Sequence, residues 1–403
     1  MVIIYPVVEL KDLIYAYRYG WLEALVNVTE GIMLRPEPVL GSVFRHGKTI
    51  RQYLVQEWGL PANVMNKLKI MLDHGINSPS FNKYFGLSKT PQNLVYVYYR
   101  LGVDFGIAFD VPVRLYISTA IDMVIGEGTE VEIDDAVKNI VIEIVNILKD
   151  RIRRKYNNIN FYALDLKTRF NVKSEARRII KSDTDIQNLL AKLSRVGVEE
   201  TIKRLKEMVE RAKNLDFKGL VPVIQGLNND DISYCIKHTI EIMSQYSNNF
   251  TIAIGTGGKV ISHEDIERIR FAIAKVKEYA RKNSISVKIH LLGWSSPNRL
   301  QDPDILRDIY SADSLTVRRR AVEGKVFILD GNSIKLTSVS QLNGRGFNCR
   351  CPACQNPILK TFILDPSGAR RNDVRMVHNI YVLMQYLNKI IRKENSLQSL
   401  TTN

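Results

Sequence analysis

Short apolar runs that end in a polar residue or a glycine recur along this chain. Five of them are KLKIMLDHG, VDFGIAFDVP, GLVPVIQG, FTIAIGTGG and VKIHLLGWSS. A continuous apolar run is typical of a strand that is buried on both faces in a parallel sheet. These runs therefore predict parallel strands, each of which leaves the core at a polar end.

Helical periodicity fills the intervals between the later runs. It marks the segments DDISYCIKHTIEIMSQYS and HEDIERIRFAIAKVKEYARKN, each preceded by an Asn, Asp or Ser that can cap a helix. Strands that alternate with helices predict right-handed crossovers between parallel strands. A (β/α)8 barrel and an open doubly wound sheet both satisfy this pattern, and periodicity does not separate them.

Polar residues at the strand ends are the first candidates for chemistry, because both folds place active sites at the carboxyl ends of their strands. A single aspartate at such a position is more commonly a helix cap or a turn former. The candidates are Asp73, Asp110, Gln225, Gly255, Gly293 and, after the letters YSA, Asp313.

Charge suggests the class of partner. Lys and Arg number 57 against 42 Asp and Glu, which gives a formal net charge of +15. Such a surplus attracts polyanions, so nucleic acid is the favoured partner, although many basic proteins bind none. The apolar start of the chain is broken by Pro6, Glu9 and Lys11 before it reaches the length of a signal peptide or membrane span. We therefore expect a cytoplasmic protein that does not enter a membrane.

The cysteine spacing predicts a metal site. Cys349, Cys351 and Cys354, followed by His378 on an amphipathic helical pattern, supply three thiolates and an imidazole. This is a complete tetrahedral set for Zn²⁺ with no open position, which is typical of a structural site. The alternative is a coincidental cluster of free thiols. Cys235 lies on a helical pattern and is expected to be a core residue.

Together with the strand-end aspartates, the cysteine motif resembles that of the queuine/archaeosine tRNA-guanine transglycosylase superfamily, most closely its DpdA branch of DNA-guanine transglycosylases. The resemblance spans about residues 65 to 390, apart from an insertion. It implies a TIM (β/α)8 barrel with a C-terminal zinc-binding subdomain. It also implies exchange of guanine in nucleic acid for a 7-cyano- or aminomethyl-7-deazaguanine base, through a covalent intermediate between an aspartate and the sugar.

The resemblance assigns roles to particular residues. Asp313 in SADSLTVR corresponds to the nucleophile, and Asp73 in LDHG corresponds to the general acid and base. The remaining motifs, AFDVPV, VIQG and GTGG, contribute residues that contact the base. These residues are Asp110, Gln225, Gly226, Gly255 and Gly257. His74, which follows Asp73 in LDHG, is a weaker candidate for binding the base.

Two clusters of arginine are candidates for binding phosphates. Any one arginine is at least as commonly a solvated surface residue, so only the clusters carry weight. The first cluster follows Asp313, and the second surrounds the cysteines: Arg318, Arg319 and Arg320, then Arg345, Arg350, Arg370, Arg371 and Arg375.

The chain departs from the family pattern at several points. His74 to Ser78 replace the usual residues after the first aspartate, and Thr316–Val317–Arg318 replace a Pro–Thr–Arg motif. The RNA-binding module of archaeal tRNA enzymes has no obvious counterpart. These departures favour DNA over tRNA. The alternatives are a tRNA-guanine transglycosylase and a non-catalytic barrel that serves as a partner subunit; a homodimer is also possible. A metal-dependent hydrolase lacks the histidines that it would need.

The predicted organisation follows from these motifs. Residues 115–216 carry long, charged, amphipathic helices and are expected to be a helical insertion. Residues 1–114 and 217–335 are expected to form the two parts of the barrel. Residues 336–393 then form the zinc-binding subdomain with its closing helix, and residues 394–403 form a frayed tail.

Overall fold

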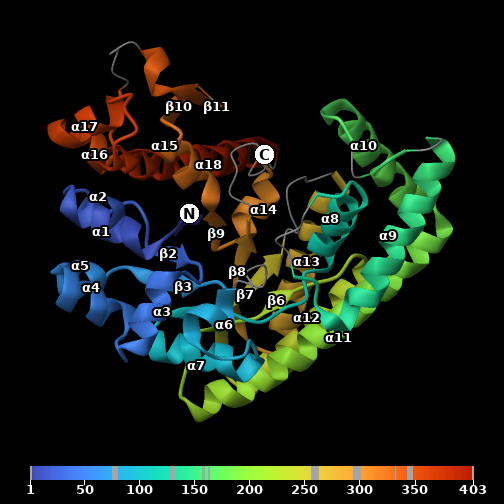
Figure 1. The fold of residues 1–403 in the computed structure, drawn as a ribbon. Coiled ribbons are helices and arrows are strands. Elements are labelled where there is room, and N and C mark those ends of the chain that lie inside the picture. Colours follow the sequence, from blue (N-terminus) through green and yellow to red (C-terminus); the bar gives the residue numbers. More distant parts are fainter. Residues whose placement is uncertain are drawn as a thin grey trace.

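Short parallel strands form a nearly closed, barrel-like sheet in this computed structural model (Figure 1). The structure describes residues 2–74, 80–127, 132–156, 159–161, 164–255, 263–293, 301–331, 333–342 and 348–401. The nine strands of the sheet are β1 (Ile3–Val8), β2 (Gly31–Leu34), β3 (Lys69–Leu72), β4 (Phe105–Ile107), β5 (Leu220–Val221), β6 (Val223–Ile224), β7 (Asn249–Gly255), β8 (Ser286–Leu292) and β9 (Ser311–Ser314). Their order is β5-β4-β3-β2-β1-β9-β8-β7-β6, and all neighbours are parallel.

The two outermost strands of this order, β5 and β6, are separated in sequence by Pro222 alone. Proline has no N–H to donate, so it interrupts the ladder at this point. Its carbonyl nevertheless accepts the N–H of Ala253 at 2.8 Å, while the N–H of Ala108 donates to Val221 at 2.8 Å. The segment therefore pairs with β4 on one side and β7 on the other. This arrangement favours a barrel over an open sheet.

Alternate residues of the strands fill the interior of the sheet, as the two-residue period of a strand requires. The outward residues pack against helices, which explains why the runs are apolar throughout. The interior cluster consists of Ile3, Tyr5, Val7, Met33, Met71, Ile107, Val221, Val223 and Ala253.

Helices cover the outer face of the sheet, where they share one large hydrophobic cluster with the outward strand residues (Figure 1). Those that precede β4 are α1 (Leu10–Arg18), α2 (Leu22–Val26), α3 (Pro38–Arg45), α4 (Ile50–Trp58), α5 (Ala62–Met65), α6 (Ser80–Phe85) and α7 (Pro91–Leu101). Those that follow β6 are α12 (Asn229–Ser244), α13 (His263–Lys282), α14 (Pro303–Asp308) and α15 (Leu315–Val322).

Four helices between β4 and β5 extend to one side of the barrel, at the right of Figure 1. They are α8 (Val113–Val124), α9 (Asp135–Lys155), α10 (Leu166–Ser182) and α11 (Thr184–Asn214). Their apolar faces form a hydrophobic cluster of their own, except that the part of α11 from Val198 onward packs in the cluster of the barrel. Aspartate caps begin three of them: Asp134, Asp165 and Asp183 accept backbone N–H groups of the first turns. The predicted helical character of this region is thus observed, while the exact domain boundaries stay predictions.

The C-terminal part packs against the barrel through one long helix. Its elements are the antiparallel strands β10 (Lys325–Asp330) and β11 (Ser333–Ser338), the 3₁₀ turns η1 (Val339–Leu342) and η2 (Arg370–Val374), and the helices α16 (Pro352–Gln355), α17 (Pro357–Leu364) and α18 (Arg375–Thr401). The sequence predicts a frayed tail from residue 394, whereas α18 continues to Thr401. None of the helices that the structure describes has both the length and the apolar character needed to cross a membrane.

Close packing of α11 on the start of α8 depends on Gly197. A Cβ atom at this position would lie 2.2 Å from Cγ1 of Val113. We expect Gly197→Ala to lower the free energy of unfolding by about 1–2 kcal/mol, because overpacking costs roughly 1–3 kcal/mol and alanine recovers up to about 1 kcal/mol of helix propensity. Urea titration measures this difference. Gly368→Ala is the control, since a Cβ there has no neighbour within 4 Å. A Gly197→Ala protein as stable as this control would contradict the packing argument.

Candidate active site and metal centre

Asp110 follows β4 and is buried against side chains from two other strand ends. His74 Nε2 lies 2.7 Å from its Oδ1, and the amide of Gln225 donates to its Oδ2. All three side chains are buried. His74 and Gln225 are 36 and 115 positions away from Asp110 in sequence, and the pairing of β4 with β3 on one side and with β5 on the other brings them together. Three of the predicted site residues therefore form one cluster.

This cluster keeps hydrogen-bonding capacity for a ligand. Each oxygen of the Asp110 carboxylate has a second lone pair beyond the bond that it already accepts. His74 Nδ1 is buried and has no hydrogen-bond partner among the described residues. If Nε2 carries the proton that is donated to Asp110, Nδ1 is an acceptor. The cluster thus presents acceptors that suit a ligand rich in N–H groups.

Two of the predicted glycines lie beside Gln225. A Cβ atom at Gly255 would come within 3.2 Å of Gln225 Nε2, so this glycine leaves room for the amide that bonds Asp110. Gly226 has a φ of +140°, and a Cβ there would lie 2.9 Å from the backbone nitrogen of Ile232. Only glycine suits that conformation and that close approach to α12. Gly257 lies outside the described residues.

Asp73, the predicted general acid and base, comes directly after β3, and its N–H donates to the carbonyl of Leu34 at 2.9 Å. Lys89, which sequence reasoning missed, lies close enough to Asp73 and Asp110 for their negative charges to raise its pKa. Burial lowers the pKa of Lys89 to about 8, and the negative charges of Asp73, Glu132 and Asp110 oppose this shift. A half-buried amine at the carboxyl ends of the strands is a candidate contact for an anionic or electron-rich ligand group.

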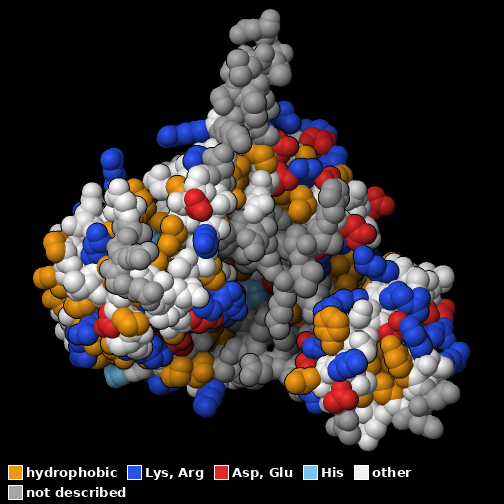
Figure 2. Space-filling model, turned by 90° about the horizontal axis from the view of Figure 1, so that it is seen from above, with side chains coloured by type: hydrophobic (Ala, Val, Ile, Leu, Met, Phe, Trp, Pro, Cys, Tyr) orange, Lys and Arg blue, Asp and Glu red, His pale blue; other side chains and the backbone are white. Residues whose placement is uncertain are grey.

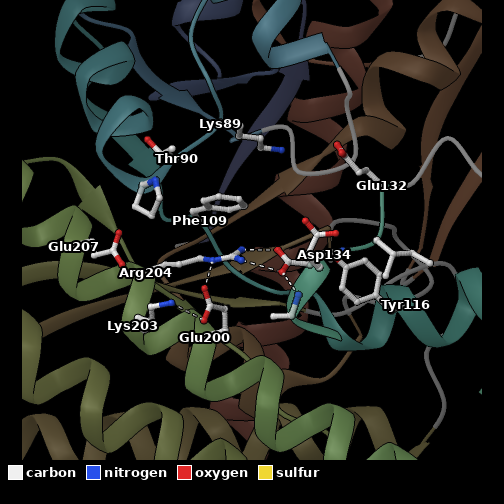
Figure 3. Close-up of a pocket in the computed structure, with 14 residues that line it drawn as sticks. Lys89, Thr90, Phe109, Tyr116, Glu132, Asp134, Glu200, Lys203, Arg204 and Glu207 are labelled. Atoms are coloured by element: carbon white, nitrogen blue, oxygen red, sulfur yellow. Dashed lines mark hydrogen bonds and ion pairs between the residues drawn. The ribbon is translucent and has the colours of Figure 1, made fainter. Parts of the chain in front are cut away.

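A pocket of about 560 Å³ lies beside Lys89 and Phe109, between the strand ends and the insertion (Figure 3). Phe109, the neighbour of Asp110, lies between two cations: the Arg204 guanidinium is 4.3 Å and the Lys89 amine 5.4 Å from its ring centroid. Arg204 also binds Asp134 through two hydrogen bonds of 2.6 and 2.9 Å. The insertion helices α9 and α11 therefore form part of the wall next to Asp110.

Asp313, the predicted nucleophile, lies at the interior face of β9 and is buried. The N–H of Gly293 donates to its Oδ1 at 2.6 Å. His290 Nε2 lies 3.5 Å from the same oxygen, and His290 Nδ1 lies 2.8 Å from the hydroxyl of Ser311. Ser311 and Asp313 share a face because side chains alternate along a strand. The carboxylate is thus held on one side by β8.

His290 is a second residue that sequence reasoning missed. It is fully buried within the interior of the sheet, beside Tyr5 at a ring-centroid distance of 6.0 Å. The signal was a histidine inside the otherwise apolar run VKIHLLG, since a polar side chain in a buried strand requires a partner. The run was interpreted only as a strand.

The arginines that were expected to bind phosphate differ in their availability. Arg318 bonds Asp12 at 2.7 Å and Glu9 at 3.1 Å, and Arg320 bonds Glu323 at 2.7 Å. Arg319 and Arg350 are exposed, and Arg345 lies outside the described residues. Figure 2 shows Lys and Arg side chains on both sides of a central hollow. Phosphate contacts by these residues stay predictions.

Arg375 was predicted to bind phosphate with the second arginine cluster, and the structure contradicts this prediction. It is 2% exposed and donates to the backbone carbonyls of Ile363, Ala321 and Asp365. A guanidinium that is buried and bonded to carbonyls in this way is not available to a phosphate. Arg375 therefore joins α18 to α15 and α17.

The four predicted zinc ligands form a compact cluster. The ligand atoms of Cys349, Cys351, Cys354 and His378 all lie within 4.8 Å of one another. His378 Nδ1 is 3.4 Å from Cys354 Sγ and 3.8 Å from Cys351 Sγ. A tetrahedral Zn²⁺ ion with ordinary bond lengths separates its ligand atoms by roughly 3.5–3.8 Å. The cluster fits zinc in both spacing and donor type.

Surrounding hydrogen bonds prepare these ligands. His378 Nε2 lies 2.8 Å from the carbonyl of Phe327, which keeps the proton on Nε2 and directs Nδ1 toward the thiols. The N–H of Cys354 donates to Cys351 Sγ at 3.2 Å, and the N–H of Cys351 donates to Cys349 Sγ at 3.4 Å. Such bonds stabilise thiolates. Cys235, by contrast, is buried in the barrel core, and burial raises the pKa of its thiol to about 11.

Asn379 connects this cluster to the helix that follows Asp313. Its Oδ1 accepts the N–H of Phe327 at 2.8 Å, and its amide donates to the carbonyls of Val317 and Lys325 at 3.4 and 3.2 Å. Val317 belongs to α15, which begins two residues after Asp313. The cysteine cluster and Asn379 therefore brace the helix that follows the predicted nucleophile.

No protein-family model matches this chain, and no curated protein matches it in sequence. The case for a function therefore depends on the geometry of the strand ends and on the motifs.

We expect purified protein to contain one zinc ion per chain, because the ligand set is complete and preorganised. Elemental analysis measures this content. Cys351→Ala should lose most of the metal and lower the melting temperature, whereas Cys235→Ala should keep a full equivalent. Less than half an equivalent in the wild type, or unchanged zinc in Cys351→Ala, would contradict the assignment.

Proposed function

We propose that this protein is a guanine transglycosylase that exchanges guanine in nucleic acid, DNA in the first place, for a 7-deazaguanine base. One observation carries the proposal. The carboxyl edge of a nearly closed parallel sheet bears a buried Asp110 bonded to His74 and Gln225, and a buried Asp313 bonded to Gly293. Carboxylates at this edge have the positions that such chemistry needs.

The proposal includes a finer description of the fold. We count β5, Pro222 and β6 as a single strand, because they are contiguous and pair with β4 and β7 on opposite sides. With this count the sheet has eight parallel strands and closes on itself. The fold is then a (β/α)8 barrel with α8–α11 as an insertion after the fourth strand.

Two carboxylates carry out different steps of the proposed reaction. Asp313 attacks C1′ of the nucleoside as the bond from C1′ to guanine breaks, forming an ester to the sugar as in retaining glycosidases. Asp73 gives a proton to the departing guanine. The same carboxylate then takes a proton from the incoming base, whose nitrogen attacks C1′ and releases Asp313. The sugar keeps its configuration because it is inverted twice.

Asp110 and Gln225 recognise the base in this scheme. Guanine presents N1–H and N2–H₂ as adjacent donors, and a carboxylate oxygen is their natural acceptor. The amide of Gln225 already orients the Asp110 carboxylate and can present its own oxygen to the base. A target inside a duplex must first be unstacked, at a cost of a few kcal/mol.

His290 is a positioning residue for Asp313. Its Nε2 is 3.5 Å from the carboxylate and its Nδ1 is fixed by Ser311, so the ring restrains the orientation of the nucleophile. The zinc cluster has a structural role in this scheme, since its four ligands leave no open position.

Exchange of radiolabelled guanine into DNA and tRNA, offered side by side, tests the function. We expect exchange into DNA, no exchange and no covalent adduct with Asp313→Asn, and a fall of about 10²- to 10⁴-fold with Asp73→Asn. Asp330→Asn, at an exposed site of β10, is the control and should retain activity. Exchange into tRNA alone would overturn the choice of DNA. Exchange into neither polymer would favour a non-catalytic partner subunit, and an active Asp313→Asn enzyme would refute the roles.

His290→Phe keeps a ring in the barrel interior but removes both nitrogens. We expect kcat to fall by roughly 10- to 100-fold with little change in KM, since the nucleophile loses its orientation while the base contacts remain. His46→Phe, at an exposed position, is the matched control. An unchanged kcat would show that His290 only fills space.

A further inference from the structure

The outward side of helix α10 in the insertion is basic and carries two exposed apolar side chains. Its exposed residues recur at helical spacing along one face: Leu166, Lys167, Phe170, Asn171, Ser174, Arg177, Arg178 and Lys181. Leu166 is 86% and Phe170 70% exposed, which are the highest values among the large apolar residues that the structure describes. The lobe at the right of Figure 2 shows basic and apolar side chains side by side.

Helix α10 places no acidic residue on this face. Glu175 is the only acidic residue within α10, and it is buried between Arg178 at 2.6 Å and Lys155 at 2.7 Å. Hydrogen bonds from Arg178, and then from Lys155, lower the pKa of Glu175 to about 2. Its negative charge is therefore directed inward.

Two cations of the face remain available. Neither Lys167 nor Arg177 forms an ion pair with any residue in the described part of the chain. The cap residue Asp165 is the nearest acid in sequence, and it accepts the N–H of Thr168 at 2.7 Å. A net positive face of this kind is complementary to a polyanion.

The position of α10 relates this face to the candidate active site. At its C-terminal end, Lys181 Nζ lies 3.9 Å from Glu264, in the first turn of α13. Helix α13 follows β7, so its start is on the carboxyl side of the sheet. Arg114 of α8 and Arg268 both pair with Asp265, which fastens the insertion to the same side.

We propose that the outward face of α10 is a docking surface for the phosphate backbone of duplex DNA, with Lys167 and Arg177 contacting phosphates and Phe170 packing against a sugar or an unstacked base. The choice of DNA as the occupant rests on the proposed function. Charge complementarity, an exposed aromatic ring among cations and a position beside the carboxyl rim support the surface itself. It would hold the duplex on the flank of the active site while one guanine is turned out.

Fluorescence anisotropy with a labelled guanine-containing duplex tests this surface. We expect K167Q/R177Q to bind about tenfold more weakly at moderate salt and to lower the slope of log affinity against log salt by about 2. Phe170→Ser should weaken binding several-fold without changing that slope. The matched control is K206Q/K213Q, which also removes two exposed positive charges. Both lie near the C-terminal end of α11, which leads into the start of β5 and so lies at the amino ends of the strands, away from the candidate site.

Each result separates the surface from the proposed chemistry. Wild-type binding that K167Q/R177Q leaves unchanged overturns the surface and leaves base exchange standing. Binding that depends on α10 without guanine exchange supports the surface and removes the proposed function. A wild-type protein that binds no duplex, or that binds tRNA or phosphatidylglycerol vesicles through α10 in preference to the duplex, overturns DNA as the occupant.

Discussion

Closure of the sheet at Pro222 is the constraint on which the rest of the structure depends. The five residues from Leu220 to Ile224 bond to β4 before the proline and to β7 after it. Pairing with β4 carries Gln225 to Asp110 across 115 positions of sequence, 31 of which belong to α11 alone. Pairing with β7 then places Gly255 beside Gln225, which joins the two halves of the sheet at the candidate site. The insertion is tolerated because both of its ends return to adjacent strands.

The sequence predicted those features of the barrel that depend on long apolar runs. The strands before Asp73, Asp110 and Gln225 were located, because each run ends in a polar residue. β1 and β2 were missed for two physical reasons. The first contains Pro6 and starts the chain, where an apolar run is ambiguous, and the second has only four residues, too few for any period to be measured. Their pairing with neighbours was set by tertiary contacts.

The candidate site was predictable to the extent that its chemistry is written in residue type and spacing. Cysteine spacing was sufficient for the metal ligands because thiolates and imidazole at those intervals have few other uses. His290 and Lys89 were missed because their significance comes from neighbours distant in sequence. Arg375 was assigned to the surface because charge alone does not reveal that backbone carbonyls surround it. Burial and partners, rather than residue type, decided these cases.

Hydrogen bonds from helix α18 connect the cysteine cluster to the barrel. His378 faces the thiols, while its neighbour Asn379 bonds both β10 and α15, and α15 begins beside Asp313. Loss of a bound ion would free the segment from Cys349 to Cys354 from His378. Helix α15 would then lose the support that it receives from Asn379 of α18. From the other direction Asp313 accepts the N–H of Gly293, which follows β8, and His290 of β8 lies 3.5 Å from the same oxygen. In the proposed reaction Asp313 must keep its orientation through two displacements, and restraint from both sides would supply it. In the proposed reaction, a zinc ion held by the cysteine cluster would therefore contribute by fixing the helix that follows the nucleophile.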